Sequence, residues 1–328
     1  MTNRRVCKGG CPLAVSAVLL VAFHPSVLSG GDLAAAESAQ TVYVSSEASG
    51  TVVAVDAASL QVLRQIDIGD RPHNLEMTPD GLLVIATQGT DSVAVLDPTK
   101  DQAPVQRHAI GAPPHDVAAA DHGRTVFVVS GRGPLVRLDP ATGRILQTIE
   151  LEGSPHNVIA SGESAWITDV SARRILIVDE DQSVEALPIS IVGHDLAVRP
   201  ASGELWVTPW NSLRVIVLDR ETRKEIAGFE VGQHPSHKHV AFTEDGNEAW
   251  ITEPASGSLF VVDAQARRLL EAVDLGGHPH HVSFAAGRAY VAAGPEELVV
   301  LDVNSREVVG RQTVGSGVHD VELDLPAD

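Results

Sequence analysis

Histidine is the residue type whose spacing points most directly to chemistry in this sequence of 328 residues. Eleven of the fourteen histidines lie in or directly before seven short segments, RPHNL, PPHDV, SPHNV, VGHDL, PSHKHV, HPHHV and GVHDV. Neutral imidazole is the commonest protein ligand for zinc, copper, iron and nickel, and it is also a general base near neutral pH. A histidine that recurs in this way therefore indicates a metal site or a proton-transfer site.

A histidine occupies the equivalent position in six of the seven segments. The candidate metal ligands are His73, His115, His156, His194, His237, His239, His280 and His319. The fifth segment is irregular, because Lys238 occupies the aligned position and histidines flank it, so either His237 or His239 can serve that repeat. The following position is polar throughout (Asn74, Asp116, Asn157, Asp195, His239, His281 and Asp320). We expect these neighbours to fix imidazole tautomers.

A second repeat predicts the fold. Strands of the type VVAVD, VAVLD and LVVLD recur at steps of 39 to 44 residues and end at Asp56, Asp97, Asp139, Asp179, Asp219, Asp263 and Asp302. The repeated aspartate is typical of a turn residue whose carboxylate accepts hydrogen bonds from nearby backbone N–H groups. Seven units of four short predicted strands indicate an all-β, seven-bladed β-propeller with four-stranded antiparallel blades.

The two ends of the repeat array are complementary. TVYVSS at 41–46 lacks a preceding first strand, whereas HDVELDL at 319–325 is a first strand alone. We therefore expect the C-terminal strand to complete the N-terminal blade and close the ring, which also removes exposed sheet edges. The segments before the first strands then all open at one end of the central channel. Loops between second and third strands share that face, which adds Glu47, Asp169 and Glu253 to the candidate site.

Two long repeats resemble a known family. TVYVSSEASGTVVAVDAASLQVLRQIDIGDRPH and AWITEPASGSLFVVDAQARRLLEAVDLGGHPH resemble the YVTN-repeat propellers, and the resemblance covers about residues 41–328. It implies the propeller fold and no particular activity. The ring of histidines is similar in architecture to the copper-cluster domain of nitrous oxide reductases. The sequence has no cupredoxin-like domain to supply electrons, so we do not expect a complete reductase of that kind.

The donor set favours some metals over others. An all-imidazole site without thiolate suits copper or zinc, whereas magnesium and calcium prefer oxygen ligands. We predict a transition-metal ion as the cofactor, with copper favoured over zinc. One ion accepts about four to six ligands. More than seven histidines therefore indicate either one ion held by neighbouring repeats or a cluster.

The N-terminus predicts export. Arg4, Arg5 and Lys8 precede an apolar run from Pro12 to Phe23 that is too short to span a bilayer, and a small-residue cleavage site follows near Ala36. We predict a signal peptide over 1–36 and a single propeller domain over 41–328 of a periplasmic or secreted protein. The export route, general secretory or twin-arginine, stays open.

Export would leave a chain without cysteine. Cys7 and Cys11 both lie upstream of the apolar run, so the mature chain has no disulfide. Losing the segment removes three basic residues and one acidic residue, which takes the formal charge from −19 to −21. Such a surface repels nucleic acid and anionic membranes, and we expect neither as a partner. No later segment is long enough to span a membrane.

Three alternatives remain beside metal binding. Structural capping is the first, because WD-type propellers place a histidine here that bonds an aspartate. The second is a lyase, since the linkers and the strands AWITE, AWITD and LWVTP resemble streptogramin-lyase-like propellers. That resemblance implies a magnesium-assisted histidine base, with His280 or His237 beside Glu253 or Asp169. The third is a non-catalytic scaffold for another exported protein or for a small molecule at the channel mouth.

Overall fold

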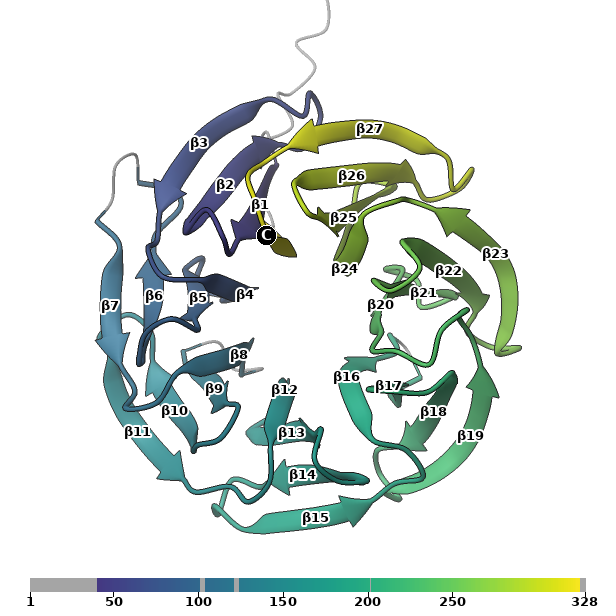
Figure 1. Ribbon diagram of the computed structural model, residues 1–328. Helices are drawn as coiled ribbons and strands as arrows, with labels where there is room; N and C mark the ends of the chain where they lie inside the picture. Colours follow the sequence, from purple (N-terminus) through teal and green to yellow (C-terminus); the bar gives the residue numbers. More distant parts are fainter. Residues whose placement is uncertain (1–39, 101–103, 121–123, 201, 325–328) are drawn as a thin grey trace, which may run out of the picture. The chain divides into compact units, whose positions relative to one another are not determined.

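The computed structural model describes residues 40–100, 104–120, 124–200 and 202–324. These residues form 28 strands in seven four-stranded antiparallel sheets, which stand as blades around a common axis (Figure 1). The predicted all-β, seven-bladed propeller is confirmed. The predicted signal peptide, with both cysteines, lies outside the described residues and stays a prediction.

Each blade runs from an inner strand to an outer strand. The first three blades are β28 (Val318–Leu323) with β1 (Thr41–Ser46), β2 (Thr51–Asp56) and β3 (Val62–Asp67); β4 (Pro72–Met77), β5 (Leu83–Thr87), β6 (Ser92–Leu96) and β7 (Gln106–Ala109); and β8 (Pro114–Ala119), β9 (Val126–Ser130), β10 (Leu135–Asp139) and β11 (Arg144–Ile149). The next two are β12 (Pro155–Ser161), β13 (Ser164–Asp169), β14 (Arg174–Val178) and β15 (Val184–Pro188); and β16 (Gly193–Val198), β17 (Glu204–Pro209), β18 (Arg214–Asp219) and β19 (Lys224–Glu230). The last two are β20 (His239–Phe242), β21 (Glu248–Glu253), β22 (Ser258–Asp263) and β23 (Arg268–Asp274); and β24 (His278–Ala285), β25 (Arg288–Gly294), β26 (Glu297–Asp302) and β27 (Val308–Thr313).

The ring closes as the sequence predicts. Strand β28, from the C-terminal part of the chain, pairs with β1 through Val42↔Leu323 and Val44↔Val321, and the blade has the order β28-β1-β2-β3. Both ends of the repeat array are thereby fixed in one sheet.

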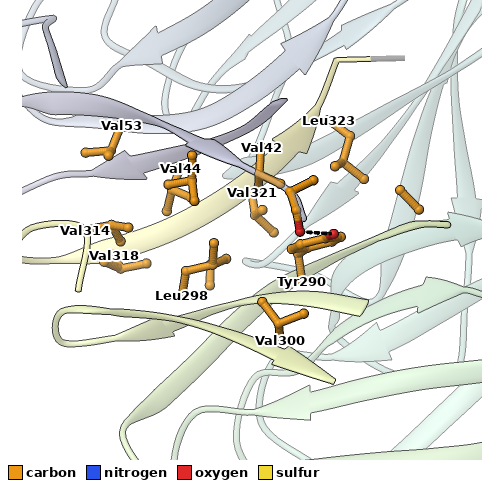
Figure 2. Packing of buried hydrophobic residues seen from close by; sticks show 14 residues of the cluster. Val42, Val44, Val53, Tyr290, Leu298, Val300, Val314, Val318, Val321 and Leu323 are labelled. Atoms are coloured by element: carbon orange, nitrogen blue, oxygen red, sulfur yellow. Dashed lines mark hydrogen bonds between the residues drawn. The ribbon is translucent and has the colours of Figure 1, made fainter. Parts of the chain in front are cut away.

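Seven hydrophobic clusters hold the blades together, one between each pair of neighbours. The cluster at the closing blade is shown in Figure 2, where Val42 and Val321 face Tyr290 and Leu298 of the preceding blade. The Tyr290 hydroxyl donates a hydrogen bond of 3.0 Å to the backbone carbonyl of Ala57. Because the second and third strands of each blade are rich in Val and buried on both faces, each blade packs both faces against its neighbours.

The repeated aspartates act as turn residues. Six of the seven accept a hydrogen bond from a backbone N–H group two or three residues later, as Asp56 does from Ser59 at 2.7 Å. In the remaining turn Asp181 plays that part by accepting from Ser183, while Asp179 accepts from the Ser164 hydroxyl. Among the described residues, no helix is both long and apolar enough to span a bilayer.

Candidate metal centre

β-Bulges present the histidines at the axis. In six of the seven blades, the pairing of the inner strand with its neighbour shifts register at the histidine or at the polar residue after it. A bulge interrupts the alternation of faces and re-aims side chains. Consecutive residues, such as His73 with Asn74 and His280 with His281, therefore line the same cavity.

All eight predicted ligands meet at one end of the propeller. We call them the histidine ring: His73, His115, His156, His194, His237, His239, His280 and His319. A closed circuit of imidazole contacts, with centroid separations of 3.7 to 5.4 Å, runs through all of them except His237. His237 lies 5.0 Å from His194 and 6.1 Å from His280, so it bridges the same gap as His239.

The ring surrounds a cavity of about 140 Å³, which Asn74, Asn157, His281 and Trp210 also line. At roughly 30 Å³ per water molecule, that space holds about four or five waters. Pockets for drug-sized ligands occupy about 300–1,000 Å³. The cavity therefore matches metal ions with a few water ligands, and it is too small for a large organic substrate.

Backbone carbonyl groups orient some of the imidazoles. Nδ1 of His73 lies 3.1 Å from the carbonyl oxygen of His115, and Nδ1 of His194 lies 2.9 Å from that of Lys238. A carbonyl oxygen only accepts, so Nδ1 carries the proton in both rings and Nε2 keeps its lone pair. Each of these bonds also links one blade to the next.

The same contact resolves the irregular fifth segment. The backbone carbonyl of Lys238 accepts from His194, just as the backbone carbonyl of His115 accepts from His73. Lys238 therefore occupies the position that a histidine holds in the other blades. Its side chain is fully buried, with Nζ 3.0 Å from Oε1 of an equally buried Glu253. Because that ion pair takes the lysine away from the cavity, His237 and His239 supply the imidazoles of this blade.

The polar residues after the histidines divide into two kinds. Asn157 orients an imidazole as predicted, since its Oδ1 lies 2.6 Å from Nδ1 of His156. The aspartates mainly join blades, because each accepts hydrogen bonds from its own strand and from the inner strand of the next blade. The inter-blade pairs are Asp116 with the Val158 N–H, Asp195 with the Val240 N–H and Asp320 with the Leu75 N–H, at 2.7 to 2.9 Å.

The three loop carboxylates have different surroundings. Glu47 reaches the ring, with Oε1 3.3 Å from Nε2 of His73. Glu253 is paired with Lys238, and Asp169 accepts from Arg174 Nε at 2.7 Å and from the backbone N–H groups of Ser154 and Ser171. Burial alone would raise the pKa of Asp169, but these hydrogen bonds hold it below its usual value. The lyase alternative needs Glu253 or Asp169 beside a histidine base. In this structure both carboxylates hold loops in place instead.

Burial sets the charge of the ring. Loss of hydration, together with neighbouring imidazoles, lowers the pKa of His73, His115, His194, His239 and His319 well below the usual value. The pKa of His156 falls to about 4 and that of His280 to about 3, again mainly through burial. These imidazoles are neutral at pH 7, and neutral imidazole is the form that binds a metal.

The pKa values of carboxyl groups next to the ring shift in the opposite direction, upward. Burial raises the pKa of Asp116, Asp195 and Asp320 above the usual value for aspartate. A cation in the cavity would stabilise their ionised forms, since an opposite charge nearby favours ionisation. The site therefore combines neutral nitrogen donors with acidic groups that gain from a positive charge.

Two groups of ligand atoms in the cavity are close enough to share an ion. His237, His239 and His280 form one, and Glu47, His73 and His319 form the other; within each, the ligand atoms lie within 4.8 Å of one another. The described part of the chain thus contains histidine groups that could hold a metal. The structure brings the predicted residues together but does not identify a metal.

Sequence reasoning missed two residues of the site. His281, noted only as part of the polar series, lies 4.2 Å from His239 between ring centroids. Trp210 stands at the rim, 38% exposed and 5.3 Å from both His156 and His194. Its signal was a lone tryptophan in TPWNS, a loop between second and third strands.

Other histidines lie elsewhere. His234 and His278 are exposed, although they belong to the linkers of the ring. His108 is on outer strand β7, where Nε2 lies 2.9 Å from the Pro140 carbonyl oxygen. His122 is outside the described residues.

The fold and the cavity together define a seven-bladed propeller with imidazoles gathered at one channel mouth. Residues 3–112 match the model of the family described as YNCE-like beta-propeller. The proteins named uncharacterized protein YncE in Salmonella typhi and Salmonella typhimurium (strain LT2) are 22% identical over 267 residues, which cover 74% of this chain and 75% of each relative. These matches and the seven blades confirm the resemblance to YVTN-repeat-like propellers.

Solved structures agree on the fold. A functionally unknown protein from Desulfotomaculum acetoxidans superposes with a TM-score of 0.75 at 13% identity, over 87% of this chain and 99% of that one. Apo AztD from Citrobacter koseri gives 0.66 at 11% identity, over 87% and 97% of the two chains. Hydrazine synthase from Kuenenia stuttgartiensis gives 0.65 at 18% identity, over 75% and 87%. At these identities the likeness concerns the fold alone.

Proposed function

We propose that this protein binds a transition-metal ion, copper in preference to zinc, through the histidine ring. One observation carries the proposal: the ligand atoms of His237, His239 and His280 lie within 4.8 Å of one another in a cavity that other imidazoles enclose. Three imidazoles on one side of an ion, with open positions for water, match the usual donor number of an accessible metal site.

The donor chemistry supports copper. Both cysteines of the sequence lie in the predicted signal peptide, so nitrogen and oxygen donors remain. For such donors the affinity of divalent ions rises along the first transition row to copper and falls again at zinc. The neutral state of the ring imidazoles means that an ion need not displace protons at pH 7.

A periplasmic or secreted location fits this function. An exported chain meets metal ions outside the cytoplasm. Its imidazole site then does not have to compete with the thiolates that are abundant in the cytoplasm. The proposal does not require catalysis. Metal ions are its partners, and a protein that delivers or receives the ion would dock at the ring's open face, where Trp210 is exposed.

Metal analysis of protein purified without a polyhistidine tag tests the proposal. After loading with Cu²⁺ or Zn²⁺ and desalting, the wild type should retain metal, and His280→Gln should retain less than the wild type, because the group formed by His237, His239 and His280 loses a ligand. His278→Gln is the matched control, because His278 lies two residues away in the same strand and is exposed. Metal-free wild type would refute metal binding by the ring, and equal retention in both variants would refute the site formed by His237, His239 and His280. Variants that only melt earlier would favour structural capping.

A further inference from the structure

The second group of ligand atoms lies at the joint where the propeller closes. Glu47 belongs to the loop between β1 and β2, His319 to β28 and His73 to β4 of the next blade. The Glu47 loop is already bonded to the segment that leads into β28, since the Glu47 N–H donates to the Gly317 carbonyl at 2.8 Å and the Ala48 N–H to that of Ser316 at 3.0 Å. Parts of the chain from both ends thus meet at this position.

The side chains there face one another. The imidazoles of His73 and His319 have centroids 3.7 Å apart, and Oε1 of Glu47 is 3.3 Å from Nε2 of His73. Nδ1 of His319 is buried without a hydrogen-bond partner. A buried polar nitrogen normally has a partner, and a metal ion would supply one.

A carboxylate distinguishes this group from the all-imidazole one. Glu47 also has a charged neighbour, since its Oε2 is 3.5 Å from Nη2 of the largely exposed Arg71. Two nitrogens and one carboxylate oxygen match zinc and divalent copper, with water completing the coordination.

We propose that Glu47, His73 and His319 form a second divalent metal site that fastens the closure of the propeller. The inference rests on the proposed function, because both sites share the cavity of the histidine ring. It adds a second ion, a carboxylate ligand and a structural consequence. An ion bound here connects the loop after β1 to strand β28, and these segments are separated by nearly the whole array of repeats.

The consequence follows from linkage. The ion binds only when β28 is paired with β1, because the three ligands come together only in the closed ring. A ligand that binds the closed form alone depletes the open form by the factor 1 + [L]/Kd, which is about 100-fold at a free ion concentration of 100 Kd. Amide hydrogen exchange through the opening of β28 should slow by about the same factor.

Zinc is the probe, because it undergoes no redox reaction. Bound zinc is counted by mass spectrometry of the metal, and amide exchange is followed in peptides covering 315–323, in the full chain with and without Zn²⁺. The wild type should bind two ions and show about 100-fold slower exchange in β28. Glu47→Gln should bind one ion and lose the zinc-dependent slowing. His280→Gln should lose the other ion and keep the slowing.

Arg71→Gln is the matched control. It removes the ion pair of Glu47 but not the carboxylate, so it should bind two ions and keep the protection of β28. If Arg71→Gln behaves like Glu47→Gln, the carboxylate acts only as an ion-pair partner and the inference is wrong. Exchange of zinc-free Glu47→Gln should match that of the zinc-free wild type, which excludes a general loss of structure.

The two proposals fail in different ways. A wild type that binds no zinc overturns both. A wild type that binds a single ion, retained by Glu47→Gln and lost by His280→Gln, overturns the closure site and leaves the metal-binding ring intact.

Discussion

Metal binding by this protein should depend on pH between 7.5 and 6.0 much less than binding by three exposed histidines would. The perturbation is acidification, and the relevant groups are the imidazoles of His237, His239 and His280. Burial lowers the pKa of all three below the usual value of about 6.5, that of His280 to about 3. A lowered pKa means that the imidazole stays neutral to a lower pH, so protons compete less with the ion.

The expected magnitude follows from the proton count. At pH 6.0 an imidazole with a pKa of about 6.5 is roughly three-quarters protonated, so three such ligands would release about 2.3 protons per ion bound. The same protonation would weaken the affinity about 50-fold relative to pH 7.5. With the three lowered pKa values, these imidazoles should release fewer than about 2.3 protons per ion, and the affinity should fall by much less than about 50-fold.

Calorimetric titration with Zn²⁺ in two buffers of different ionisation enthalpy measures the protons released at pH 6.0. Circular dichroism at each pH shows whether the fold is intact. Release of about two protons, or an affinity loss near 50-fold, would show that these imidazoles are protonated like exposed ones. The packing argument for a neutral ring would then be wrong.

Four further predictions concern stability. The metal-free protein should lose stability as the pH falls below about 6.5, because unfolded histidines take up protons that the folded ring does not. The loss should be at most about 1.4 kcal/mol per ring imidazole at pH 5.5, and urea unfolding across this range measures it. Burial raises the pKa of Glu76 to about 7, so its charge costs stability as the pH rises through 7. Glu76→Gln should therefore stabilise the protein at pH 9 by up to about 3 kcal/mol, and by little at pH 5, in the same assay. Lys238→Met should cost about 3–5 kcal/mol in the free energy of unfolding by leaving Glu253 buried and unpaired, and adding Glu253→Gln should recover part of the loss. Leu298→Ala in the closing cluster should cost about 2–5 kcal/mol, and a loss below 1 kcal/mol in chemical denaturation would show that this core is not tightly packed.

The parts of the site that repeat could be predicted from sequence. A position that recurs in every blade of a closed ring must return to the same height along the axis, so the convergence of the eight ring histidines followed from their spacing. Closure by the strand after Gly317 was also predictable, because an unpaired first strand at one end of the repeat array matched a missing first strand at the other. Neither inference depends on the details of side-chain packing.

The parts that break the repeat could not be predicted. Glu253 and Asp169 lie in loops on the expected face. Glu253, however, forms an ion pair with the buried Lys238, and Asp169 bonds Arg174 and nearby backbone N–H groups. Competition of this kind depends on side-chain contacts that differ from blade to blade. The rim position of Trp210 depends likewise on how one loop folds over the neighbouring imidazoles.

Structural capping and metal binding are compatible at the same histidine, because imidazole has two nitrogens. In His73 and His194, Nδ1 donates to a carbonyl group of the next blade, and that bond leaves Nε2 with a lone pair for an ion. The inter-blade bond both steadies the propeller and fixes the tautomer that a ligand needs. Substituting such a histidine should therefore lower the stability of the metal-free protein and its metal affinity together. At His280, whose Nδ1 faces Nε2 of His239 at 3.4 Å rather than a carbonyl group, the loss should fall mainly on the metal.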